Sequence, residues 1–181
     1  MTTALLLLLP LLAAAGPDAT RPDFSGTWER ADAEPERPSV ASTGDLSFRS
    51  GSMGSGWGAL LTLRQDARAL VVEYVHFSAY DLQPPVRLTF ALDGSDSTNA
   101  VMIGHAASAQ RSRAAWRDRT LVITTELAGP EPGRSVQVRQ ALTLESPDTL
   151  QVETTREASG GAPPSVTRTT YARRQEPPAG R

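Results

Sequence analysis

The segment Phe24-Ser25-Gly26-Thr27-Trp28 is the most specific feature of this chain. Its glycine lets the backbone pass close to another element, and its tryptophan lays a large ring across one end of a core. The stretch from Phe24 to Arg30 is therefore predicted to be the first strand of a packed domain. The plainest interpretation of the motif is a plug that closes the core without a ligand role.

Beyond this motif, apolar and polar residues alternate with a period of two, which is the pattern of half-buried strands. No long window carries the i, i+3, i+4, i+7 spacing of an amphipathic helix. Turn signals recur every ~8–15 residues, as in a β-sandwich or an up-and-down barrel. Because short turns join consecutive strands, we expect an all-β, antiparallel up-and-down meander barrel of about eight or nine strands. The strands predicted after the first are 57–65, 70–77, 86–92, 107–116, 119–127, 136–144, 150–156 and 166–173.

The start of the chain is predicted to be a targeting segment. A short leucine-rich run ends in Ala13-Ala14-Ala15, which is typical of a cleaved secretory signal peptide and too short to span a bilayer. We therefore expect a secreted or periplasmic protein with no membrane span once the leader is removed. The expected divisions are a signal peptide at 1–15, a mature N-terminal segment at 16–21, a barrel domain at 22–174 with a long loop at 31–56, and a disordered tail at 175–181.

Composition excludes several classes of protein. The chain has no cysteine, all 18 of its basic residues are arginine, and its net charge is −2. A zinc finger, a disulfide scaffold, a thiol enzyme and a strongly basic nucleic-acid binder are therefore excluded. A lipid-anchored lipoprotein is excluded as well, because the thiol that would accept the lipid is missing.

The opening motif resembles that of the calycins, the lipocalins and fatty-acid-binding proteins, whose barrels begin with G-x-W and in the second group often with F-x-G-x-W. The chain is more similar to exported bacterial proteins that open with DFSGTW, continue with a DG hairpin and a W-x-x-x-LV strand pair, and end in Y-x-R. Most of that group has no assigned activity. The corresponding pieces are Asp23 to Trp28, Asp93-Gly94, Trp116 to Val122 and Tyr171-Ala172-Arg173.

The resemblance implies that the barrel is lipocalin-like, and it also implies one specific contact. In lipocalins an arginine near the end of the barrel packs over the first-strand tryptophan, so Arg173 is expected to make a cation–π contact with Trp28. Phe24, Gly26, Trp28 and Arg173 are then structural residues. The order Tyr171-x-Arg173 is the reverse of the R-x-Y that holds a carboxylate in fatty-acid-binding proteins, so that ligand chemistry does not transfer.

A barrel of about eight strands is wide enough to hold one small ligand. Arg111 and Arg113 share one face of a strand, and two interpretations of them stay open. Facing inward they would anchor a ligand carboxylate, because an unpaired buried charge is costly. Facing outward, which is the default for charge, they would be a solvated face that discourages edge pairing. The apolar residues predicted to line the interior are Tyr74, Leu88, Phe90, Ile123 and Leu142.

Catalytic and metal-binding patterns are absent from the sequence. His76 and His105 are its only histidines, and neither HxH nor HExxH spacing occurs. Glu73, Glu126 and Glu153 lie in mid-strand and are expected to face solvent. We therefore expect no metal, no cofactor and no enzyme activity, unless His76, His105 and Glu73 meet in a cleft.

The sequence is compatible with two functions. One is a non-catalytic exported binder of a small apolar molecule inside the barrel, with no nucleic-acid partner. The alternative is a structural or interaction module of the cell envelope with a filled core and no ligand. A hollow interior would favour the first and a solid interior the second.

Overall fold

The computed structural model describes residues 21–31, 56–75, 85–103, 106–128, 134–159, 161 and 163–175. Within these ranges the chain forms one antiparallel sheet of ten strands and no helix. The signal peptide at 1–15, most of the loop at 31–56, both histidines and most of the tail lie outside the described residues. The strands are β1 (Gly26–Arg30), β2 (Leu60–Gln65), β3 (Ala69–Tyr74), β4 (Val86–Ala91), β5 (Asp96–Ile103), β6 (Ala106–Arg117), β7 (Thr120–Ala128), β8 (Ser135–Ser146), β9 (Thr149–Ala158) and β10 (Ser165–Arg173).

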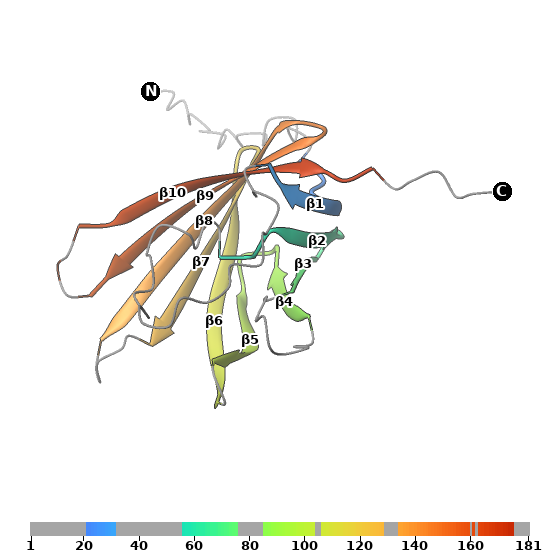
Figure 1. The fold of residues 1–181 in the computed structure, drawn as a ribbon. Coiled ribbons are helices and arrows are strands. Elements are labelled where there is room, and N and C mark those ends of the chain that lie inside the picture. Colours follow the sequence, from blue (N-terminus) through green and yellow to red (C-terminus); the bar gives the residue numbers. More distant parts are fainter. Residues whose placement is uncertain are drawn as a thin grey trace, which may run out of the picture.

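The order of the strands confirms the predicted meander. The sheet runs β4-β3-β2-β1-β10-β9-β8-β7-β6-β5, so every ladder joins consecutive strands except the one between β1 and β10. That ladder places the first and last strands side by side, with Trp28 opposite Arg173. The long strands β6 to β10 form one broad twisted wall, and β1 to β4 complete the curve into a nearly closed barrel (Figure 1).

The two edge strands, β4 and β5, meet along a seam held by side chains. Thr89 donates its backbone N–H to Asn99 Oδ1 at 2.7 Å, and Asn99 Nδ2 donates to the carbonyl oxygen of Thr89 at 3.0 Å. Ala91 donates its N–H to Ser97 Oγ at 2.8 Å. The Asn99 amide thus pairs with Thr89 as a peptide group of a neighbouring strand would, and it satisfies part of an otherwise open edge.

Strand β5 does not follow from the sequence pattern. Its opening Asp96-Ser-Thr-Asn99 consists of residues that favour turns, so the pattern predicts only a turn at its start. These polar residues form a strand because the side chains of Ser97 and Asn99 make hydrogen bonds with the backbone of the edge strand β4. The strand count is therefore ten, slightly more than predicted.

The opening motif closes the core as expected. Trp28 is fully buried and donates its indole N–H to the carbonyl oxygen of Phe24 at 2.9 Å. The Arg173 guanidinium lies 4.2 Å from the centre of the Trp28 ring, which confirms the predicted cation–π contact. Gly26 has φ +142°, and a Cβ there would collide with the Arg173 guanidinium. The glycine is therefore required both by backbone conformation and by space.

Two ends of the barrel differ in their connections. At the turn end, short turns follow β2, β4, β6 and β8. At the loop end, longer connections follow β1, β3, β7 and β9. In the part of the chain that the structure describes, no helix is long and apolar enough to cross a bilayer.

Candidate functional site

The five predicted lining residues all point into the barrel. Their exposed fractions range from 0% for Ile123 and Leu142 to 8% for Tyr74. They belong to one buried apolar cluster that also contains Trp28 and Tyr171. These side chains therefore pack against one another, and much of the interior is a core.

Arg111 and Arg113 lie on the outer face of β6. Both residues are exposed, whereas Ser112 and Ala114 between and beside them are buried. Arg113 forms an ion pair with Asp96 of β5, with Nη2 and Oδ1 2.8 Å apart. The outward orientation is the one that the sequence favoured, and it rules out both arginines as anchors inside the barrel.

A different arginine faces inward. Along β9, Leu150, Val152 and Thr154 are fully buried, and the period of two carries the same face on to Arg156. Arg156 is half-buried, and removal from water lowers the pKa of its guanidinium. With the residues that the structure describes, it makes neither a hydrogen bond nor an ion pair. Sequence reasoning missed Arg156 because it ends the predicted strand, and only the alternation along 150–156 could have indicated its direction.

The segment from Gly56 to Gly58 lies between Arg156 of β9 and Tyr74 of β3. A Cβ at Gly56 would lie 3.4 Å from Arg156 Nη2, and one at Gly58 would lie 3.9 Å from Tyr74 Cδ2. Tyr171 donates its hydroxyl to the carbonyl oxygen of Gly58 at 2.9 Å, and Trp57 is buried. The segment is therefore held between β9 and β3, with Arg156 on one side and Tyr74 on the other.

Two hydroxyl groups lie on the inner face of the barrel toward the loop end. Thr154 is fully buried on the same strand face as Arg156, and its Oγ1 has no hydrogen-bond partner among the described residues. Tyr74 lies on the far side of the Gly56–Gly58 segment; burial raises the pKa of its phenol, whose hydroxyl makes no hydrogen bond within the described ranges. A guanidinium and a hydroxyl donor on one strand face are groups that can hold an oxyanion.

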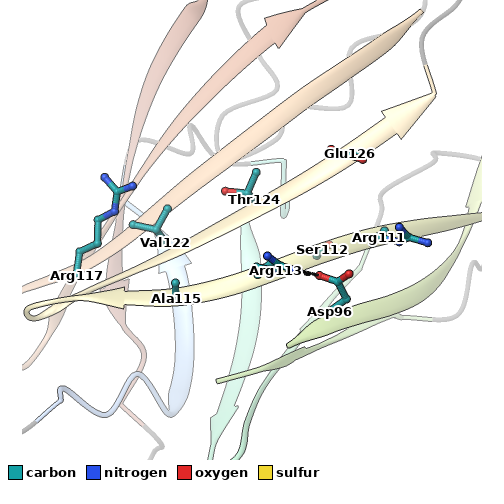
Figure 2. Close-up of a pocket in the computed structure, with 9 residues that line it drawn as sticks. All are labelled: Asp96, Arg111, Ser112, Arg113, Ala115, Arg117, Val122, Thr124 and Glu126. Carbon is teal, nitrogen blue, oxygen red and sulfur yellow. Dashed lines mark hydrogen bonds and ion pairs between the residues drawn. The ribbon is translucent and has the colours of Figure 1, made fainter. Parts of the chain in front are cut away.

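A second candidate site is a groove on the outside of the barrel, with a volume of about 460 Å³. Figure 2 shows Arg117 and Arg111 at opposite ends of a row along β6, with the Arg113–Asp96 pair between them and β7 beside them. The residues that line it are Asp96, Arg111, Ser112, Arg113, Ala115, Arg117, Val122, Thr124 and Glu126.

The acidic residues considered from the sequence are held on the outer face. Glu73 lies 3.3 Å from Arg87 and 3.7 Å from Arg64, and Glu153 pairs with Arg168 at 2.8 Å. Glu126 is exposed at the edge of the outer groove. Among the described residues, no three His, Cys, Asp or Glu side chains come together as a metal site would need.

No family model matches this chain, and no curated protein matches it. Inferences about its function therefore depend on the residues and their geometry.

Proposed function

We propose that this is an exported, non-catalytic protein that binds a small amphipathic anion at the loop end of its barrel. The observation that carries the proposal is Arg156, a half-buried cation without a counter-charge among the described residues. Desolvating a guanidinium costs free energy that an ion pair normally offsets. A carboxylate or sulfonate of a bound molecule would supply the missing partner.

The surroundings of Arg156 fit the polar end of such a ligand. Thr154 adds a hydroxyl donor on the same face of β9, and donors directed at an anion make short, strong hydrogen bonds. Val138, directly opposite Arg156 on β8, supplies apolar surface beside the guanidinium. The sequence predicts an apolar ligand, and the surroundings of Arg156 favour an apolar ligand that also carries an anionic head group.

Export is supported by the leader-like sequence at the start of the chain. The leucine-rich run and Ala13-Ala14-Ala15 match a signal peptide, with the mature protein in the periplasm or outside the cell. A barrel without cysteine would depend on its core alone for stability in that environment.

Dodecanoate binding to the mature protein, measured by calorimetry, tests the proposal. We expect Arg156→Met to weaken binding by about 10- to 100-fold, because a hydrogen bond to a charged group contributes roughly 1.5–3 kcal/mol. Arg168→Met is the matched control, since this arginine is exposed on β10 and paired with Glu153. Equal binding by wild type and Arg156→Met would contradict the proposal.

Stability supplies a second readout for Arg156. Without ligand, Arg156→Met should have the same free energy of unfolding as wild type or one up to ~1 kcal/mol higher, because it removes a desolvated charge that has no ion pair within the described residues. A purely structural role would give the opposite sign. Gain of stability together with loss of binding is the signature of a ligand site.

The packed interior favours a second candidate function, an interaction module of the cell envelope. Phe90, Ile123 and Leu142, three of the predicted lining residues, belong to the core cluster, and a barrel packed toward its turn end is what such a module requires. If wild-type protein binds neither dodecanoate nor dodecyl sulfate, this second function is the better account.

A further inference from the structure

The outer groove on β5, β6 and β7 carries three arginines, of which one is paired with a carboxylate among the described residues. Arg113 is neutralised by Asp96 through two contacts, from Nε at 2.9 Å and from Nη2 at 2.8 Å. Arg111 and Arg117 form no ion pair with any residue in the described ranges. Glu126 lies opposite Arg111 in the register of β6 and β7 without forming an ion pair with it. Two exposed guanidinium groups are thus left available at the two ends of the groove (Figure 2).

The spacing of these arginines matches an extended polypeptide. Residues on one face of a strand repeat every ~7 Å, so Arg111 and Arg117 are about 20 Å apart along β6. A ligand peptide in the extended conformation has the same repeat. Acidic side chains six positions apart would lie on one face and reach both arginines.

Between Arg113 and Arg117, the groove is lined by side chains without charge. Ala115 and Val122 lie opposite each other in the β6–β7 register, and Val122 is only 6% exposed although it is on the outer face. The hydroxyl-bearing Thr124 lies beside them. This stretch offers a shallow apolar surface next to Arg117, and the mutually neutralised Arg113–Asp96 pair occupies the rest of the span to Arg111.

We propose that this groove binds an extended peptide segment of a partner protein, with acidic residues at its two ends and small residues between them. The groove carries its own carboxylates, Asp96 and Glu126, and these would repel a polymer with charge at every unit. A peptide can place its charges at Arg111 and Arg117 and leave the middle neutral. Arginine clusters recognise acidic motifs in this way through paired guanidinium–carboxylate hydrogen bonds.

The test uses two fluorescein-labelled peptides of equal composition and measures fluorescence anisotropy with the mature protein. The first is Glu-Thr-Ala-Thr-Ala-Thr-Glu, whose carboxylates share one face of an extended chain. The second is Glu-Thr-Ala-Thr-Ala-Glu-Thr, whose carboxylates point to opposite faces. We expect the first to bind about fivefold more tightly, the effect of one exposed ion pair, and to weaken as salt rises.

Variants separate the groove from the rest of the surface. Arg111→Ala and Arg117→Ala should each weaken binding of the first peptide by about threefold to fivefold. Arg64→Ala, on the outer face of β2 and 66% exposed, should leave it unchanged. All three positions are exposed, so circular dichroism should show unchanged folding.

Three results would overturn this inference: equal binding of both peptides, equal binding by the Arg111 and Arg117 variants, or tighter binding of polygalacturonate than of the first peptide. The last would identify the partner as an acidic polysaccharide. Arg156→Met is expected to bind the first peptide as wild type does. The failure of this inference and that of the proposed ligand site are therefore distinguishable.

Discussion

Arg173 and Gly26 form a matched pair that fixes the end of the barrel. Besides covering the Trp28 ring, Arg173 donates from Nη1 to the carbonyl oxygen of Ser25 at 2.5 Å and from Nε to that of Pro147 at 2.9 Å. One side chain thus joins the start of β1 to the turn between β8 and β9. The Arg173 guanidinium occupies the space that a side chain at residue 26 would need.

Gly26→Ala should therefore destabilise the protein strongly. The new methyl group would displace the Arg173 guanidinium and require an alanine at φ +142°, for an expected loss of roughly 2–4 kcal/mol. Gly94→Ala is the matched control, since Gly94 also has a positive φ, of +83°, but open space around it. Urea denaturation measures both variants. If both lose the same free energy of unfolding, the contact with Arg173 is less important than we argue.

Asp66 contributes a pH-dependent part of the stability. Its carboxylate accepts hydrogen bonds from the backbone N–H groups of Arg68 at 2.7 Å and Ala69 at 2.8 Å. These bonds, that of Arg68 first, hold the pKa of Asp66 below its usual value. The folded state thus binds protons less readily than the unfolded chain. The contribution is complete above about pH 4, and it is lost as the pH falls through the folded pKa.

Asp66→Asn tests this contribution. The variant keeps an oxygen that accepts hydrogen bonds but removes the charge, so it should be less stable than wild type at about pH 6. The difference in the free energy of unfolding should shrink as the pH is lowered to about 3. Urea titrations at several pH values measure it, and a difference that does not change with pH would contradict the assignment.

At the scale of elements, the seam between β4 and β5 depends on the Asn99 amide. Asn99→Asp keeps the acceptor for the Thr89 N–H but turns an oxygen toward the Thr89 carbonyl in place of the donor. We expect a loss of about 1–3 kcal/mol, because a buried acceptor is left without its donor. Faster hydrogen exchange at the Thr89 amide should accompany this loss.

Thr98→Val is the control for the seam, because Thr98 is on the same strand but exposed on the other face. It should change neither stability nor exchange appreciably. If Asn99→Asp behaves like Thr98→Val, contacts other than the Asn99 side chain hold the seam.

The same seam shows what sequence periodicity could and could not reveal. Nine of the ten strands follow from alternation and turn signals, because most of them bury an apolar face between clear turns. Strand β5 begins with polar residues that bond to a strand edge, and that edge exists only after the sheet has curled. Arg156 was missed for a related reason. Alternation predicts that Arg156 shares a strand face with Leu150 and Val152. It does not predict that this position is half-buried at the loop end of the barrel.

On the scale of the whole molecule, the barrel closes through its two terminal strands. β1 is a strand of five residues that pairs with β2 on one side and β10 on the other. Its Trp28 contacts residues far away in sequence, among them Arg173. The opening motif was predictable because it is local, whereas its role in joining the two ends of the chain is a property of the closed sheet.

The closed sheet divides the interior into a packed part and a polar part, and Leu142→Ala tests that division. Leu142 is fully buried in the core cluster, so its truncation should cost about 2–5 kcal/mol if the turn end is filled. Leu60→Ala, at a position that is 41% exposed, should change stability by less than about 0.5 kcal/mol.

The same variant separates core from ligand site. Because the proposed anion contacts Arg156 at the loop end, Leu142→Ala should bind dodecanoate with wild-type affinity at temperatures where it remains folded, whereas Arg156→Met should not. A small stability loss with weakened dodecanoate binding would instead mean that Leu142 lines a ligand chamber. The barrel would then be hollow through to its turn end, and the ligand's apolar tail would take the place that we assign to the packed core.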